Sequence, residues 1–305
     1  MWENSTPWLP RRKSAARCCD SGVEVVDAEE NQYLYGMAQI MGIINLTEDS
    51  FYAASRTRAD EAVERAGKML QEGADILDLG ACSTRPGASQ PSALEEWTRL
   101  EGSLKAIREA FPEAQLSIDT YRSFVVERAY DAVGPLLVND VSAGTLDAGM
   151  LPLVGALGLP YVAMHMRGTP ETMQENTDYA DITEEVAGYF EDFGRKAGEY
   201  GIEDWILDPG FGFAKTVQQN YELLRNLHRF KALGRPVLVG LSRKSMVYKP
   251  LGITPEEALA PTQVLHFAAL EKGADILRVH DVAEAVRTDK LYSTIYTSSP
   301  GAANR

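Results

Sequence analysis

Eight short apolar segments recur along this chain, and segments with the residue spacing of helices lie between them. The apolar segments have the length of strands, whereas in DEAVERAGKMLQEGA apolar residues recur three and four positions apart before a closing glycine. Nearly continuous apolar strands that alternate with helices are typical of a parallel sheet covered by helices. The eight segments are AQIMGIINL, ADILDLG, QLSIDT, PLLVND, PYVAMHM, DWILDPG, PVLVGLS and ADILRVH.

Eight strand and helix units predict an α/β fold, a single (β/α)8 TIM barrel over residues 38–296. The alternative is an open, doubly wound sheet, but MGIINLTEDSF stands where that fold would carry a glycine-rich dinucleotide fingerprint. We expect residues 1–20 to be a short disordered N-terminal extension and residues 21–37 to form a hairpin or plug before the barrel. Residues 297–305 are expected to be a flexible tail.

The chain is acidic, with a formal net charge of −14 over 305 residues, which argues against general binding to nucleic acid or anionic membrane. Its three cysteines, two of them adjacent at Cys18 and Cys19, fit neither a disulfide framework nor a zinc-ligand spacing. No stretch approaches the ~18 apolar residues of a membrane span, and the N-terminus lacks the apolar region of a signal peptide. The arginines and serines of the N-terminus leave organelle targeting as an alternative. The acidic residues Glu3 and Asp20 favour a loose extension instead. The cytoplasm is the expected location.

Polar side chains gather where the predicted strands end. Any one of them could cap the following helix, which is a common role for Asp and Asn. Together they bring carboxylates, amides and cationic or imidazole groups to one rim, on the barrel face where enzymes of this fold carry their sites. We therefore expect the active site there. The residues are Asn45, Asp78, Asp119, Asn139, Asp140, His165, Asp208, Ser242, Arg243, Lys244, Arg278 and His280.

The chemistry of this rim favours a ligand that carries both a flat polar ring and a phosphate. Asp119, Asn139 and Asp208 suit a heterocycle with several N–H donors, and Lys244 could donate to a carbonyl of the same ring. The glycines of DPGFGFAK would let backbone approach a ligand closely. Two long polar segments, TEDSFYAASRTR and ACSTRPGASQPS, are expected to be mobile active-site loops. The groups that suit phosphate are Arg85, Arg243, Arg278 and His280.

These motifs resemble the dihydropteroate synthase family of folate biosynthesis. The resemblance runs from about Ala38 to Tyr296 and implies a barrel transferase that joins 6-hydroxymethyl-7,8-dihydropterin diphosphate to 4-aminobenzoate. It also implies release of diphosphate, a requirement for Mg2+ and, commonly, a homodimer. The motifs that carry it, in the family's order, are MGIINLTEDSF, STRPGA, SIDT, NDVSAG, MHMRGTP, LDPGFGF, GLSRKS and LRVHDV.

The resemblance also implies roles for individual residues of this chain. Asn45 matches the ligand of magnesium, and Asp119, Asp208, Lys244, Arg278 and His280 form the expected catalytic set. The pterin is expected at Asp119, Asn139, Asp208 and Lys244, the diphosphate at Thr84, Arg278 and His280, and the aminobenzoate near Arg85, Pro86, Phe213 and Ser242. The chain departs from the commonest family pattern in both loops, at Glu48, Ala53, Ala54, Ala81 and Cys82.

Three other functions remain as alternatives at this point: a methyltransferase domain that binds a methylated pterin, a catalytically silent pterin-binding subunit, and a barrel with an unrelated phosphate ligand. STRPG and SRKS argue against the methyltransferase, and retention of Lys244, Arg278 and His280 argues against a silent subunit. Arg243 is expected to point away from the site, on the alternating pattern of a strand. It would then bind an anion at the rim, contact a loop, or lie in a dimer surface.

Overall fold

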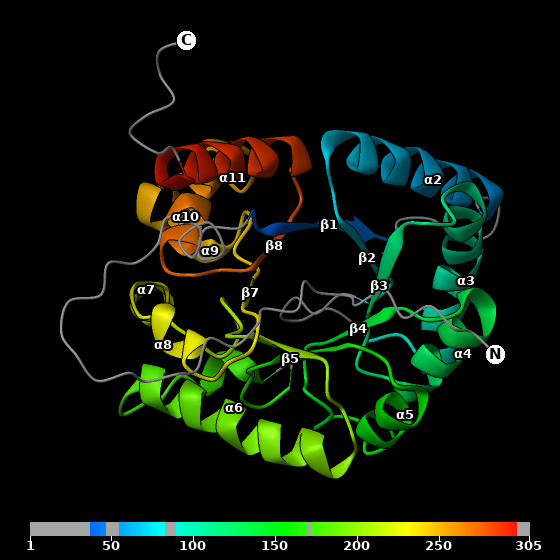
Figure 1. Cartoon of the computed structure of the whole chain (residues 1–305), viewed down its shortest axis with the longest axis horizontal. Helices are drawn as coiled ribbons and strands as arrows, with labels where there is room; N and C mark the ends of the chain where they lie inside the picture. Colours follow the sequence, from blue (N-terminus) through cyan, green and yellow to red (C-terminus); the bar gives the residue numbers. More distant parts are fainter. Residues whose placement is uncertain (1–36, 47–54, 83–89, 170–171, 298–305) are drawn as a thin grey trace, which may run out of the picture.

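A computed structural model describes residues 37–46, 55–82, 90–169 and 172–297, which form an α/β barrel with parallel strands at its centre and helices around them (Figure 1). The expected extension, plug and tail fall outside the described residues, except for Met37 and Thr297. The strands are β1 Gln39–Asn45, β2 Ile76–Gly80, β3 Gln115–Asp119, β4 Leu137–Asp140, β5 Tyr161–Met164, β6 Trp205–Asp208, β7 Leu238–Val239 and β8 Ile276–Val279.

The eight strands close on themselves. Hydrogen-bonded neighbours follow the order β6-β5-β4-β3-β2-β1-β8-β7, and all of these pairs are parallel. The remaining gap, between β6 and β7, is bridged by a parallel pair of Leu207 and Val237, where the Leu207 N–H donates to the Pro236 carbonyl at 3.0 Å. The predicted barrel is therefore confirmed, and the open-sheet alternative is wrong.

The helices that surround the strands also follow the sequence pattern. The segment DEAVERAGKMLQEGA lies in α2 and the turn that follows it. That turn contains Gly73, whose φ of +102° is a left-handed value that suits glycine. The α-helices are α2 Ser55–Glu72, α3 Ala93–Ala110, α4 Ser123–Val133, α5 Met150–Leu157, α6 Ile182–Glu199, α7 Val217–Arg225, α8 His228–Lys231, α9 Ser245–Tyr248, α10 Leu259–Glu271 and α11 Val282–Thr297, and the 3-10 turns are η1 Met173–Glu175, η2 Lys249–Leu251 and η3 Glu256–Ala258.

Two separate apolar clusters fill the molecule. The larger lies between the sheet and the helices, and the smaller contains one side chain from each strand except β3. Along each strand the two clusters alternate, as with Ile40 and Met41 or Ile76 and Leu77, so the smaller cluster marks the inward positions. This apolar plug closes the barrel interior below its carboxyl end. Its members are Met41, Ile76, Leu137, Val162, Ile206, Leu238 and Ile276.

Across the described ranges no helix combines the length and apolar character needed to cross a membrane.

Candidate active site

A polar layer lies directly above the apolar plug. Two residues beyond the plug, the inward positions of β2, β4, β6 and β8 hold Asp78, Asn139, Asp208 and Arg278. Four side chains from alternate strands are the usual layer of a barrel of this type. The change from apolar to polar residues at one step along every second strand therefore places the polar groups at the carboxyl end, as the sequence predicted.

Asp78 is the centre of one half of this layer. Its side chain is fully buried and accepts hydrogen bonds from Ser117 Oγ at 2.6 Å, Asn139 Nδ2 at 3.0 Å and Arg278 Nε at 2.6 Å. The same guanidinium donates from Nη2 to Asp119 Oδ2, also at 2.6 Å. Arg278 is thus held between two carboxylates, and four strands are linked through side chains alone.

The other half is built around Lys244 and Asp208. Lys244 follows β7, and its Nζ donates to the Phe211 carbonyl at 2.5 Å and lies 4.8 Å from the centre of the Phe213 ring. Asp208 ends β6, and its Oδ1 accepts from the Gly210 N–H at 2.8 Å. The loop between β6 and α7 therefore forms one wall of the site, with its backbone turned toward Lys244.

Burial shifts the titration of these groups. It raises the pKa of Asp208, an effect that the Lys244 and Arg278 charges oppose, and it raises the pKa of Asp119 against the effect of Arg278. Burial also lowers the pKa of Lys244 to about 8, although Asp208 opposes the change. Lys244 therefore remains mostly cationic at neutral pH and loses its proton in mildly alkaline solution.

Ser242 and His280 contact each other across the turns that follow β7 and β8. The Ser242 hydroxyl lies 3.1 Å from His280 Nδ1 and also accepts from the His280 backbone N–H at 3.4 Å. Burial, together with Arg278, lowers the pKa of His280 to about 4, so the imidazole is neutral near pH 7. With the hydroxyl proton directed at Nδ1, the ring proton lies on Nε2, where it can be donated to a ligand.

Arg243 does not lie in the strand from which its direction was predicted. Its φ of +55° belongs to a turn rather than a strand, because β7 ends at Val239 and the Lys244 N–H already bonds the Leu241 carbonyl. Its guanidinium grips both oxygens of Asp281, at 2.8 and 2.9 Å, and donates to two carbonyls of the chain before α10. Of the three expected roles, loop contact is the one that the described residues show.

The remaining sequence predictions concern the mouth and the two loops. Asn45 ends β1, is exposed, and makes no side-chain hydrogen bond to a described residue. Cys82, one of the loop departures, donates to Gln90, and burial raises its pKa to about 11, so the thiol is unreactive at neutral pH. The positions outside the described residues are Glu48, Ala53, Ala54, Thr84, Arg85 and Pro86.

Sequence reasoning did not identify Lys215. This side chain is only 4% exposed, and its Nζ has four acceptors: the carbonyls of His165, Gly210 and Phe213 at 2.9–3.3 Å, and His165 Nδ1 at 3.0 Å. Burial lowers the pKa of Lys215 and Asp208 opposes this, while burial and Lys215 lower the pKa of His165 to about 2. The only signal in the sequence was the lysine that closes DPGFGFAK.

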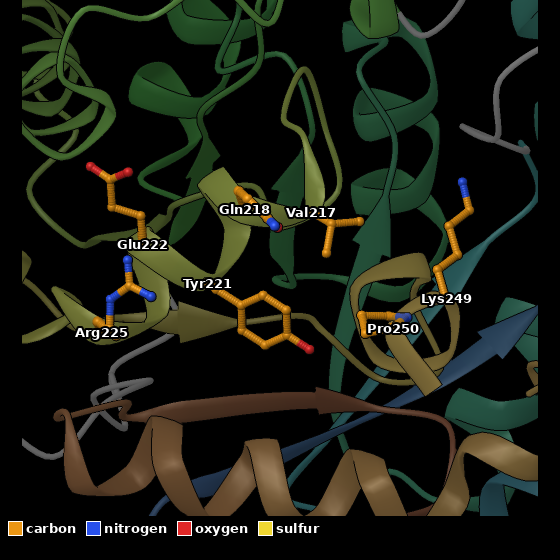
Figure 2. Close-up of a pocket in the computed structure, with 7 residues that line it drawn as sticks. All are labelled: Val217, Gln218, Tyr221, Glu222, Arg225, Lys249 and Pro250. Atoms are coloured by element: carbon orange, nitrogen blue, oxygen red, sulfur yellow. The ribbon is translucent and has the colours of Figure 1, made fainter. Parts of the chain in front are cut away.

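A surface hollow of about 780 Å³ lies outside the barrel mouth, between α7 and the turn at Lys249 and Pro250 (Figure 2). Arg225 and Glu222 lie at one end of it and Lys249 at the other, and Val217, Gln218 and Tyr221 lie between them. None of the strand-end residues lines this hollow. The strand-end polar groups therefore lie apart from this hollow, in the mouth of the barrel.

Comparison of the chain with known proteins identifies related proteins. A family described as pterin binding enzyme matches residues 41–280. The dihydropteroate synthase of Synechocystis sp. is 41% identical over 261 residues, which cover 84% of this chain and 90% of that protein.

Two solved structures have a similar fold over most of this chain. The Xanthomonas albilineans dihydropteroate synthase with 4-aminobenzoic acid has a TM-score of 0.78 at 36% identity, over 86% of this chain and 94% of that one. The Thermus thermophilus dihydropteroate synthase in complex with 6HMPPP has a TM-score of 0.73 at 36% identity, over 85% and 94%. With eight ordered motifs, a closed barrel and a polar layer at its carboxyl end, the chain belongs to the dihydropteroate synthase family of pterin-binding transferases.

Proposed function

We propose that this chain condenses 6-hydroxymethyl-7,8-dihydropterin diphosphate with 4-aminobenzoate, and that the polar layer above the plug is its pterin pocket. The observation that carries the proposal is the pairing of acceptors and a donor in that layer. Asp208 and Asn139 offer oxygens from β6 and β4, and Lys244 offers a cationic donor from the turn after β7. A pterin has N–H and amino donors beside a ring carbonyl, so it satisfies all three groups.

The diphosphate is assigned to Arg278 and His280. Arg278 uses Nε and Nη2 on carboxylates, and its Nη1 donates to no described residue. Its lowered pKa leaves His280 neutral, and with the Ser242 proton on Nδ1 the Nε2–H would add a hydrogen bond without a fixed charge. Thr84 is assigned to the same end of the substrate, and it lies outside the described residues. Bound diphosphate would raise the pKa of His280 by its negative charge.

Magnesium fits this site only as a partner of the substrate. Within the described residues no group of three or more His, Cys, Asp or Glu could hold a metal ion, and Asn45 offers one neutral oxygen. Mg2+ usually takes its other ligands from phosphate and water, and its charge would offset that of the leaving group. Calorimetry is therefore expected to detect magnesium binding only with diphosphate present, and tight binding to the free chain would contradict the assignment.

The reaction needs charge control more than a strong base. The C–O bond between the pterin methylene and the diphosphate breaks, the electron pair leaves with the diphosphate oxygen, and the electron-rich ring shares the resulting positive charge. Arg278 and the His280 N–H stabilise the leaving group. The amine of 4-aminobenzoate then forms the C–N bond to the methylene. Its extra proton becomes acidic only after attack and passes to solvent or to the released diphosphate.

The aminobenzoate is assigned to the region around Ser242 and Phe213, next to the Lys244 ammonium. The Phe213 ring offers an apolar face for the benzoate ring. The Ser242 hydroxyl has a single proton, which would turn from His280 Nδ1 to the benzoate carboxylate when that substrate binds. Arg85 and Pro86 are assigned to the same substrate and lie in the loop outside the described residues. The two substrates would then meet at the turn that carries Ser242 and Lys244.

An assay of diphosphate release, with and without 4-aminobenzoate, tests the proposal. Release is expected only when both substrates are present, and Asp208→Asn, which keeps the shape but removes the charge, is expected to abolish most of it. A methyltransferase or a silent pterin-binding subunit would bind the pterin without aminobenzoate-dependent release. That result, obtained with folded protein, would overturn the assignment.

We also propose a homodimer and a cytoplasmic location. Helices α10 and α11 pack side by side (Figure 1). Each carries an exposed apolar side chain, since Val264 is 68% exposed and Leu291 63%. Sedimentation of the wild-type chain is expected to give a dimer, and Leu291→Glu a monomer. Leu94→Glu, at an equally exposed position on α3, is the matched control. A wild-type monomer at micromolar concentration would contradict the assignment.

A further inference from the structure

Asp78 has no substrate contact in the proposed function, although it is the most completely buried carboxylate facing the mouth. It lies two residues above Ile76 of the apolar plug, in the middle of β2. Its two oxygens take three donors from three other strands, namely Ser117, Asn139 and Arg278. Burying a carboxylate costs free energy unless hydrogen-bond donors surround it. The three donors therefore stabilise Asp78, and Asp78 in turn holds them in position.

The first consequence concerns the amide of Asn139. An ionised carboxylate only accepts hydrogen bonds, so the group that faces Asp78 Oδ2 must be the NH2 of Asn139. The amide oxygen then points the other way, and it accepts no hydrogen bond from any described residue. With the opposite orientation the amide would turn a donor toward the mouth, and the carbonyl oxygen would repel Asp78.

The second consequence concerns Arg278. Nε is held by Asp78 and Nη2 by Asp119, which fixes the guanidinium plane at two points. Asp78 Oδ2 accepts from both Asn139 and Arg278, so one oxygen atom sets the directions of two groups assigned to substrate. Asp78 Oδ2 therefore orients both the Asn139 amide, which is assigned to the pterin ring, and the Arg278 guanidinium, which is assigned to the diphosphate.

We propose that Asp78 is a positioning residue that sets the donor and acceptor pattern of the pterin pocket, and hence its selectivity for rings that present an N–H or amino donor to Asn139. This inference rests on the proposed pterin site. A ring that has an acceptor in place of this donor, such as adenine, would set its ring nitrogen against the amide oxygen of Asn139. A site built to hydrogen-bond a particular group rejects analogues that lack it, because its own buried groups stay unpaired.

Guanine and adenine distinguish this role from a general contribution to stability. Guanine has the same edge as a pterin, with N–H and amino donors beside a carbonyl. Adenine has a ring acceptor in place of the N–H and an amino group in place of the carbonyl. Calorimetric titration of the wild-type chain is expected to show the pterin and guanine binding more tightly than adenine. The ratio of guanine to adenine affinity is then the readout, because a loosened fold would weaken both rings alike.

Asp78→Ser and Asp78→Asn are the informative variants. A serine hydroxyl donates as well as accepts, so it allows both orientations of the Asn139 amide, and we expect the affinity ratio to fall about tenfold. An asparagine can keep its oxygen toward Asn139 and Arg278 while its NH2 donates to Ser117 Oγ. We therefore expect Asp78→Asn to retain the ratio within about twofold.

Asp140→Asn is the matched control. Asp140 is also fully buried at the end of a strand and accepts three hydrogen bonds, from Ser142, Gly144 and Tyr161, but it lies on the outward face of β4. The control is expected to leave the affinity ratio unchanged even where it lowers stability. An unchanged ratio in folded Asp78→Ser, or an equal fall in Asp78→Asn and Asp78→Ser, would overturn the role of Asp78.

A measurement on the wild-type chain covers the case in which Asp78→Ser does not fold. The Asn139 side-chain NH2 is expected to exchange slowly with solvent, by nuclear magnetic resonance, both before and after pterin binding. Rapid exchange in the free chain would contradict its bond to Asp78. If the wild-type chain binds neither the pterin nor guanine, the proposed function fails. If it binds both but the ratio does not respond as stated, only the inference about Asp78 fails.

Discussion

Asp78 and Lys215 are both buried ionisable side chains beside the barrel mouth, but they gather different groups. Asp78 holds the side chains of Ser117, Asn139 and Arg278, which come from three strands. Lys215 holds three backbone carbonyls and one imidazole nitrogen, which come from the end of β5 and the loop after β6. One wall of the site is therefore fixed by a pattern of side chains, and the opposite wall by the path of the backbone.

The difference has a physical origin. Residues in a parallel strand already have their backbone groups paired, so only side chains are left to build the Asp78 wall. The loop after β6 has no strand partner, and its carbonyls need a donor. Gly210, at φ +70°, brings this loop so close that a Cβ would lie 2.1 Å from the His165 carbonyl oxygen. Lys215 supplies the donors that such a tight crossing requires.

Lys215→Met is expected to give the largest effect and tests whether the backbone wall depends on the donors of one lysine. Methionine fills a similar volume but removes the buried donor from the His165 and Phe213 carbonyls and from His165 Nδ1, which costs about 3 kcal/mol or more of unfolding free energy. Denaturant unfolding measures this cost. Lys196→Met, an exposed position on α6, is the control and is expected to change stability by less than about 0.5 kcal/mol. Equal stability of the two variants would remove Lys215 from the account.

The titration of Lys244 gives the next effect and sharpens the electrostatic side of the comparison. Its pKa is lowered to about 8, so the cation is present below that pH and is lost as the pH rises through it. We expect kcat/KM for the pterin substrate to fall about tenfold per pH unit well above pH 8, since this ratio reports groups of the free enzyme. In Lys244→Arg the side chain stays charged, so the alkaline fall is expected to disappear. A profile that is flat to pH 9.5 in the wild-type chain would contradict the assignment.

Ser242→Ala is expected to give the smallest effect. It concerns 4-aminobenzoate, which is assigned to neither Asp78 nor Lys215. Losing one neutral hydrogen bond is expected to raise KM for 4-aminobenzoate about threefold to tenfold and to leave pterin affinity nearly intact. Lys244→Ala, two residues along, should instead weaken pterin binding strongly. Equal loss of pterin affinity in both variants, measured by calorimetry, would show that the contact of Ser242 with His280 matters more than its contact with substrate.

The sequence allowed one wall to be predicted better than the other. Strand ends in a barrel converge, so Asp119, Asn139, Asp208 and Arg278 could be placed at one rim from their position in each apolar segment. The order of the eight segments gave the closed fold for the same reason. These predictions needed only the alternation of strand residues and the direction of parallel strands.

The missed features depend on backbone conformation. Arg243 was assigned by strand alternation, but β7 ends early and the residue lies in a turn at φ +55°. Lys215 follows a strand by seven positions and bonds mainly to carbonyls, which every residue has and no sequence pattern marks. Asp78 was placed in its strand without a role, since its importance comes from the three donors that surround it.

The central claim is that one pterin ring is held between the two walls, by Asn139 on the Asp78 side and by Asp208 on the Lys215 side. Calorimetric titration of a pterin into Asn139→Ala, Asp208→Ala and the double variant tests it most directly. Each single change is expected to weaken binding about tenfold or more, because each leaves ring donors buried without an acceptor, and the double variant is expected to be the weakest. Unchanged affinity in either folded single variant would contradict the claim, because the ring would then rest on one wall alone.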